Sequence, residues 1–269
     1  MKKILVMEYN EDLLRSLKGQ RVVVQINTLE QLESRYSESQ RNNEVVAMCV
    51  RLPFTSISQI DFKQDWSQIP LIIYAFNIGN YDSFFRKVNL IRSLDLRIYL
   101  SNESETSYTD LKVMSSLGVD CGLYMAPGKK MSDDSFLDLA SYYFMSPVPH
   151  ATIEPFEHIL RHLDVEKSEG FKSVFFEDPL KFTLISSLDI FDECEHNNID
   201  NDFAIKIKEH YQHFIDLDEC AKCPAFKICD KQMFQKLNEC QKTMNEVYEY
   251  AELRNSINSK QETKIICQL

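Results

Sequence analysis

The chain has 269 residues, 44% of them hydrophobic, and a formal net charge of −11. This length and composition are typical of a folded protein that buries a substantial core. The negative charge disfavours nucleic acid and anionic membranes as partners, because both would repel the chain except at a local basic patch, and the sequence shows none. No apolar run reaches the roughly 18 residues of a membrane-spanning helix, and the first residues turn polar too soon for a signal peptide. We therefore expect no membrane partner and a reducing, cytoplasmic compartment.

The first 125 residues alternate between short apolar runs and amphipathic segments. The apolar runs predict strands at 4–7, 22–26, 44–50, 70–76, 96–100 and 119–125. The segments between them predict helices at 11–17, 28–36, 81–94 and 109–117, the last closed by Gly118. Such near-continuous apolar strands indicate a parallel sheet buried on both faces. The sheet is either open and doubly wound or curved into an incomplete barrel.

The next 63 residues are less regular, and an acidic stretch follows them. Helices are predicted at 135–145 and 155–163, with possible strands at 171–176 and 182–188. Residues 193–202 are strongly acidic and polar, which favours a domain boundary nearby. We therefore expect an α/β body over residues 1–188 and a small cysteine-rich module over residues 189–269.

A cluster of three cysteines is the clearest chemical signal in the sequence. Cys220, Cys223 and Cys229 have the spacing C-x2-C-x5-C. Two thiols separated by two residues can bind one ion when a tight turn brings their sulfurs together, and Pro224 stiffens such a turn. A disulfide framework and a thioredoxin-type redox pair both fit this context poorly. The spacing therefore predicts a bound metal or cluster, and it does not separate zinc from iron–sulfur.

The fourth ligand is predicted to be Cys240. It lies on a helix expected over residues 231–254, on the stripe that this helix buries. That position suits a ligand, and it also suits an ordinary buried thiol. Substitutes for this fourth position are Cys194, Cys267, His210 and His213.

The run Cys220, Cys223, Pro224, Cys229 resembles the core of the SPASM domain, the C-terminal extension of radical SAM enzymes that modify peptides and proteins. The family pattern is C-x2-C-x5-C-x3-C, and Met233 stands here at its last position. An upstream cysteine pair for a second cluster is not evident. The resemblance implies one auxiliary [4Fe–4S] cluster held by the three matching cysteines and a downstream one, for which Cys240 is the nearest candidate.

The β-α body also resembles the partial barrel of radical SAM enzymes in outline. The C-x3-C-x2-C motif that holds their catalytic cluster is absent, since Cys49 and Cys121 stand alone in predicted strands and are expected to be core thiols. The resemblance therefore implies a degenerate member without the catalytic cluster, and we do not expect an enzyme.

Other catalytic motifs are missing from the sequence. Its six glycines form neither a dinucleotide fingerprint nor a P-loop. His158 and His162 are spaced i,i+4 without the H-E-x-x-H pattern, and we expect solvated helix histidines. The sequence thus favours a non-catalytic SPASM-like metalloprotein that binds a precursor peptide or a partner maturase. The alternatives are an iron–sulfur electron-transfer subunit and a zinc-stapled α/β protein of other function.

Overall fold

The structure is a computed structural model that describes most of the first 163 residues and selected segments after them. The described residues are 4–16, 19, 21–39, 42, 44–63, 66, 68–76, 81–101, 106–124, 132–163, 182–184, 220, 222–227 and 237–266.

Eight parallel strands form one sheet in the order β7-β6-β5-β4-β3-β2-β1-β8. The strands are β1 (Ile4–Glu8), β2 (Arg21–Ile26), β3 (Val45–Pro53), β4 (Leu71–Phe76), β5 (Leu96–Ser101), β6 (Cys121–Tyr124), β7 (Ile153–Glu154) and β8 (Phe182–Leu184). From β1 to β7 each strand pairs with the next one along the chain, which is the strand order of a β/α barrel. Strand β8 returns to pair with β1 on its other side.

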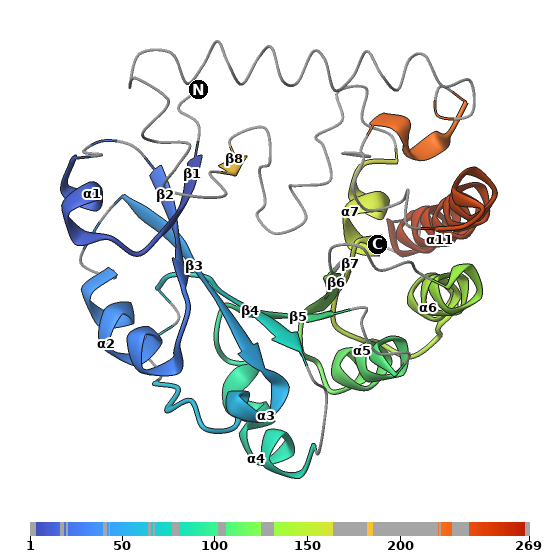
Figure 1. Cartoon of the computed structure of the whole chain (residues 1–269). Coiled ribbons are helices and arrows are strands. Elements are labelled where there is room, and N and C mark those ends of the chain that lie inside the picture. Colours follow the sequence, from blue (N-terminus) through green and yellow to red (C-terminus); the bar gives the residue numbers. More distant parts are fainter. Residues whose placement is uncertain are drawn as a thin grey trace.

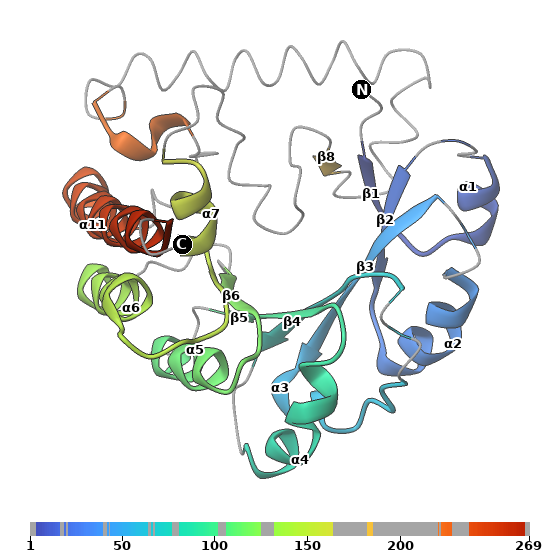
Figure 2. The same ribbon diagram turned by 180° about the vertical axis from the view of Figure 1, so that it is seen from behind.

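Helices connect the strands and cover the convex side of this curved sheet (Figure 1). They are α1 (Glu11–Ser16), α2 (Leu29–Ser39), α3 (Phe54–Ile57), α4 (Asp82–Ile91), α5 (Ser107–Ser116), α6 (Asp133–Met145) and α7 (Phe156–Arg161). The view from behind shows the same curved sheet with α1 to α6 outside it (Figure 2). Within the described strands β7 and β8 are the two edges, so the barrel is incomplete. The predicted parallel α/β fold with a partial barrel is confirmed at this level.

The two faces of the sheet differ in chemistry. Residues that pair across neighbouring parallel strands point to the same face, and the face alternates along each strand. One face is apolar and lies against the helices, as where the Cys121 sulfur lies 3.6 Å from the Leu111 carbonyl oxygen of α5. The concave face is mixed: one row across β3 to β7 consists of Arg51, Tyr74, Tyr99, Gly122 and Glu154, and the row before it pairs Cys49, Ile72 and Arg97. On this row Arg51 is exposed and Tyr74 half-buried, whereas Tyr99 and Glu154 are buried.

A buried aromatic pair fixes α2 against the segment before β4. The rings of Tyr36 and Trp66 stack with centroids 4.4 Å apart, and both residues are fully buried. The Tyr36 hydroxyl donates to the carbonyl oxygens of Trp66 and Ile69, at 2.6 Å for Ile69. Because a buried hydroxyl needs such partners, this contact sets the position of α2.

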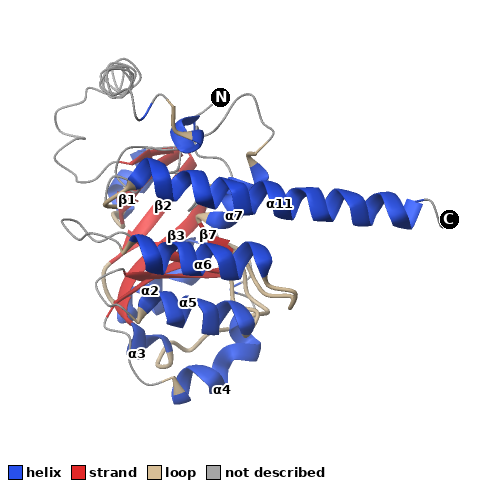
Figure 3. Ribbon diagram, turned by 90° about the vertical axis from the view of Figure 1, so that its right-hand side faces the viewer, coloured by secondary structure: helices blue, strands red, loops and turns tan. Residues whose placement is uncertain are grey.

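The C-terminal part consists of a short 3-10 helix, η4 (Pro224–Lys227), and the long helix α11 (Cys240–Ile266). Helix α11 packs along α6 and α7 and then extends well past the body (Figure 3). Its start is fixed by Asp133 at the beginning of α6, whose carboxylate accepts from the backbone N–H groups of Asn238 and Glu239 at 3.1–3.2 Å. Unpaired N–H groups at a helix start need such acceptors.

The prediction of a continuous helix over 231–254 is wrong at both ends. Residues 237–239 form a bend and turn, and α11 begins at Cys240 and runs to Ile266. The physical reason at the start is Asp133, which binds two N–H groups directly before Cys240. Leu237, Met244, Val247 and Ala251 are buried.

Most of the predicted strands and helices of the first 163 residues are confirmed, and two short elements were not predicted. Helix α3 and strand β7 had no expected counterpart, and β3 continues three residues beyond its predicted end. Strand β8 falls within the predicted strand 182–188, whereas 171–176 and the boundary at 188 lie outside the described residues. Among the described helices, none combines the length and apolarity needed to cross a membrane.

Candidate functional site

A tight turn brings the first two predicted metal ligands together. The backbone N–H of Cys223 donates to the Cys220 carbonyl oxygen at 3.1 Å, and the N–H of Phe226 donates to the Cys223 carbonyl oxygen at 3.0 Å. Pro224, which the sequence predicts to stiffen this turn, is the first residue of η4. The fixed φ of proline suits that position. The backbone therefore forms a turn between Cys220 and Cys223, as the sequence predicts.

The Cys223 sulfur lies in a half-buried, partly polar setting. Burial raises the pKa of this thiol, and the neighbouring Cys220 raises it further. The nearby backbone N–H groups of Ala225 and Phe226 act in the opposite direction and lower the pKa. Backbone N–H donors are the groups that stabilise a metal-bound thiolate. Cys223 thus has polar backbone groups on one side of its thiol, and it is less buried than the two cysteines of the body.

The third described cysteine of the predicted set begins the helix that packs on this turn. Helix α11 contacts η4, and Cys240, its first residue, is partly buried against the hydrophobic core, as is Cys223. Asp133 holds the chain directly before Cys240 through two backbone N–H groups. The fold therefore sets Cys240 at a defined point on the body.

The remaining predicted ligands lie outside the described residues. These are Cys229 of the main set, and Cys194, Cys267, His210 and His213 among the substitutes. Within the residues that are described, no three His, Cys, Asp or Glu side chains gather into a metal-binding group. The structure thus brings Cys220 and Cys223 together, and the four-cysteine set remains a prediction.

The two cysteines of the body are core thiols, as predicted. Cys49 on β3 and Cys121 on β6 are both buried, and the two strands between them are β4 and β5. Burial raises the pKa of Cys49 to about 12 and that of Cys121 well above its ordinary value. Such thiols stay protonated at neutral pH and are poor metal ligands.

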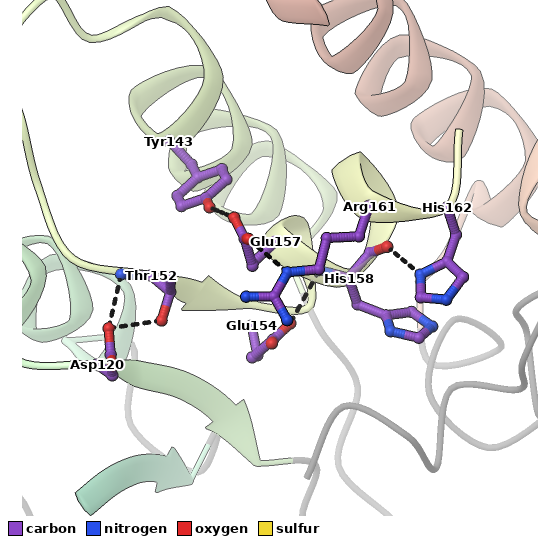
Figure 4. Close-up of polar contacts among 8 residues, drawn as sticks. All are labelled: Asp120, Tyr143, Thr152, Glu154, Glu157, His158, Arg161 and His162. Carbon is purple, nitrogen blue, oxygen red and sulfur yellow. Dashed lines mark hydrogen bonds and ion pairs between the residues drawn. The ribbon is translucent and has the colours of Figure 1, made fainter. Parts of the chain in front are cut away.

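A polar network lies at the edge of the sheet, on β7 and α7, and sequence reasoning missed it. Glu154 of β7 is buried, and its carboxylate accepts from the backbone N–H of His158 at 3.1 Å (Figure 4). Burial raises the pKa of Glu154 to about 7, although the Arg97 charge and the His158 N–H oppose this shift. Glu154 therefore ties α7 to the concave face of the sheet.

Gly122 of β6 makes room for this network. A Cβ on Gly122 would lie 2.4 Å from Cε1 of Tyr99 and 3.0 Å from Cβ of Glu154. The Tyr99 ring, itself buried, thus crosses the strand where a side chain is missing. Only glycine at this position allows β5, β6 and β7 to bring Tyr99 and Glu154 together.

Three further contacts hold β7 and α7 in place. The Asp120 carboxylate accepts from the backbone N–H and the hydroxyl of Thr152, at 3.0 and 2.7 Å, directly before β7. The Tyr143 hydroxyl of α6 donates to Glu157, and Arg161 Nε donates to the same carboxylate at 2.7 Å. These contacts link α6, β6 and α7 into one unit.

The prediction that His158 and His162 are solvated is wrong for His158. Its side chain is only 5% exposed, because α7 packs between the sheet edge and α11. The two imidazole rings lie 4.1 Å apart, and Nδ1 of His162 is 2.9 Å from the His158 carbonyl oxygen. The sequence spacing predicts their proximity, but it gives no sign of the α11 contact.

No family model matches the chain, and neither the curated proteins nor the solved structures include a significant match.

Proposed function

We propose that the chain is a non-catalytic, SPASM-like metalloprotein that binds a precursor peptide or the enzyme that modifies it. The observation that carries the proposal is the Cys220–Cys223 turn, in which the Cys223 N–H donates to the Cys220 carbonyl oxygen and the half-buried Cys223 thiol lies close enough to Cys220 for the two to interact. Helix α11, beginning at Cys240, packs beside this turn.

The proposed metal group is a [4Fe–4S] cluster, with zinc as the alternative. Cys220, Cys223, Cys229 and Cys240 would hold it. A bound group of either kind needs deprotonated cysteines. Burial disfavours the Cys223 thiolate, and the positive charge of the bound metal would stabilise it. The chain's own contribution is to present these thiols from two elements that already pack together. In this role the group would fasten the turn to α11.

The proposal that the chain is not a radical SAM enzyme rests on the cysteines of the α/β body. Radical SAM chemistry requires three clustered cysteines in the barrel, and the cysteines of the described body are Cys49 and Cys121. They are buried on separate strands with raised pKa values, so they do not supply such a site.

The concave face of the sheet is the proposed peptide-binding surface. Ligands of parallel α/β proteins bind at the carboxyl ends of the strands. At that end Arg51 is exposed, with its guanidinium 5.5 Å from the Phe76 ring, and Tyr74 is half-buried. A guanidinium on an aromatic face beside a tyrosine suits the carboxylate and backbone groups of a peptide.

An affinity capture with matched variants tests this function. Immobilised wild type is expected to retain a precursor peptide or a peptide-modifying enzyme from a lysate of the source cells. Cys223→Ala is expected to lose the bound peptide or enzyme because it disrupts the cysteine-rich module. Arg51→Ala is expected to lose it because it removes a contact on the concave face. Cys121→Ala removes a buried thiol from the side of the sheet that faces the helices and serves as the control that keeps binding. A wild-type chain that retains the same proteins as both loss variants would contradict the proposal.

A further inference from the structure

Two histidines lie side by side at the C-terminal end of α7. His158 belongs to the helix, and His162 is the residue that caps its end. The centroids of the two imidazole rings are 4.1 Å apart, and Figure 4 shows the rings next to each other. Residues four apart lie on the same side of a helix, one turn from each other. One helical turn therefore presents both rings together.

A backbone contact determines which nitrogen of His162 can bind a metal ion. Nδ1 of His162 is 2.9 Å from the His158 carbonyl oxygen. A carbonyl oxygen only accepts, so Nδ1 carries the proton of this hydrogen bond, and in the neutral ring the lone pair is on Nε2. Histidines that bind a metal through one nitrogen commonly donate the other N–H to a carbonyl oxygen. His162 thus has Nε2 available as a ligand.

The ring of His158 is held in place by the fold. Its side chain is only 5% exposed, its backbone N–H donates to the buried Glu154 carboxylate at 3.1 Å, and α7 packs against α11. An imidazole has two ring nitrogens, so one can bind a metal while the other bonds a neighbouring group. His162 is half-buried, so solvent reaches the pair from its side. The pair therefore combines a fixed ring with an accessible one.

The separation of the rings suits a metal ion that imidazole binds. In a tetrahedral zinc site, Zn–N distances of about 2.0–2.1 Å place two ligand nitrogens about 3.4 Å apart. The two rings, with centroids 4.1 Å apart and planes inclined by 35°, need only a small rotation to bring two nitrogens to that separation. The carbonyl groups at the end of a helix also favour a cation. The other charged side chains of α7, Glu157 and Arg161, pair with each other at 2.7 Å.

We propose that His158 and His162 form a binding site for a divalent transition-metal ion, with Zn²⁺ as the ion to test. Imidazole nitrogens are among the ligands that zinc prefers. Within the described residues no third His, Cys, Asp or Glu joins the pair, so we expect a weaker site than a four-cysteine centre, with exchangeable positions on the metal. The site uses no cysteine, and it does not depend on the proposed function of the cysteine module.

Equilibrium dialysis of the full chain against micromolar Zn²⁺, followed by metal analysis, tests the site. Wild type is expected to hold about one zinc per chain more than His162→Gln, which removes an imidazole at a half-buried position. His158→Gln is expected to lose the same zinc. Every variant keeps the eight cysteines of the chain, so zinc bound by cysteine cancels in the comparison.

The matched control is His150→Gln. Both ring nitrogens of His150 lie next to carbonyl oxygens, Nδ1 at 3.1 Å from that of Ala151 and Nε2 at 3.0 Å from that of Tyr143. This histidine therefore has no ring nitrogen directed at a metal, and His150→Gln is expected to keep the zinc content of wild type.

Nitrogen NMR of the imidazole rings gives a second readout of the same site. Without metal, His162 is expected to carry its proton on Nδ1, and Zn²⁺ is expected to shift its Nε2 resonance, which is assigned by its loss in His162→Gln. Equal zinc content in wild type and His162→Gln would overturn the proposal. So would a proton on Nε2 of metal-free His162, or the loss of the same zinc in His150→Gln.

Discussion

Replacing Gly122 with alanine should destabilise the body by a specific clash. The added Cβ would lie 2.4 Å from Cε1 and 2.7 Å from Cδ1 of Tyr99, where carbon atoms normally stay about 3.5–4.0 Å apart. The ring cannot retreat easily, because Tyr99 is fully buried and its ring centroid is 5.8 Å from that of Tyr74. Glu154 Cβ, at 3.0 Å, blocks the other side.

The size of the effect follows from two opposing terms. Overpacking a well-filled site costs about 1–3 kcal/mol, and this clash belongs at the upper end because it involves ring atoms and a strand backbone. The lower flexibility of alanine in the unfolded chain returns up to about 1 kcal/mol. We therefore expect Gly122→Ala to lower the free energy of unfolding by about 2–3 kcal/mol.

Urea unfolding followed by tryptophan fluorescence measures this loss in the body. The single tryptophan, Trp66, is buried and stacked on Tyr36, so its emission reports unfolding of the body. As a control, Gly122→Ala should cost much less in a Tyr99→Leu background, because the clashing ring is gone. An unchanged unfolding midpoint in the single variant would refute the placement of Tyr99 across Gly122.

Two further predictions concern buried polar groups. Tyr36→Phe should cost about 1–3 kcal/mol in the same assay, because it leaves buried carbonyl oxygens of Trp66 and Ile69 without their donor; an unchanged midpoint would speak against these bonds. Folding raises the pKa of Glu154 from 4.5 to about 7, so the folded state holds this proton more tightly. Compared with Glu154→Gln, wild type should therefore lose stability, on the order of 3 kcal/mol, as pH rises from about 4.5 to about 7. Thermal unfolding at a series of pH values measures this, and parallel curves for the two proteins would contradict it.

The alternating pattern of the first 125 residues was enough to predict the parallel sheet and its helices. Each strand there is an apolar run, which leaves a local signal in the sequence. Strand β7 was missed because it has two residues and depends on Asp120, which lies directly before β6 and holds Thr152. Such a contact leaves no local trace in the sequence.

At the candidate metal centre, too, the sequence predicts the local structure but not the long-range contacts. The spacing of Cys220 and Cys223 with Pro224 predicted a turn, and the turn is present. The true start of α11 could not be read from the sequence, since it depends on Asp133, more than a hundred residues earlier. The burial of His158 likewise depends on α11 packing against α7. Local patterns thus predict the ligand turn, and long-range contacts decide what surrounds it.

The central claim, that the cysteine module holds a metal group, is tested most directly by the metal content and visible absorption of protein purified without oxygen. We expect brown wild-type protein with about four irons per chain, as a [4Fe–4S] cluster requires. Cys223→Ala should lose both iron and colour, and the buried-thiol control Cys49→Ala should keep them. One zinc per chain without colour would keep the site but overturn the cluster. Wild-type protein without bound metal, or equal metal content in Cys223→Ala, would contradict the claim.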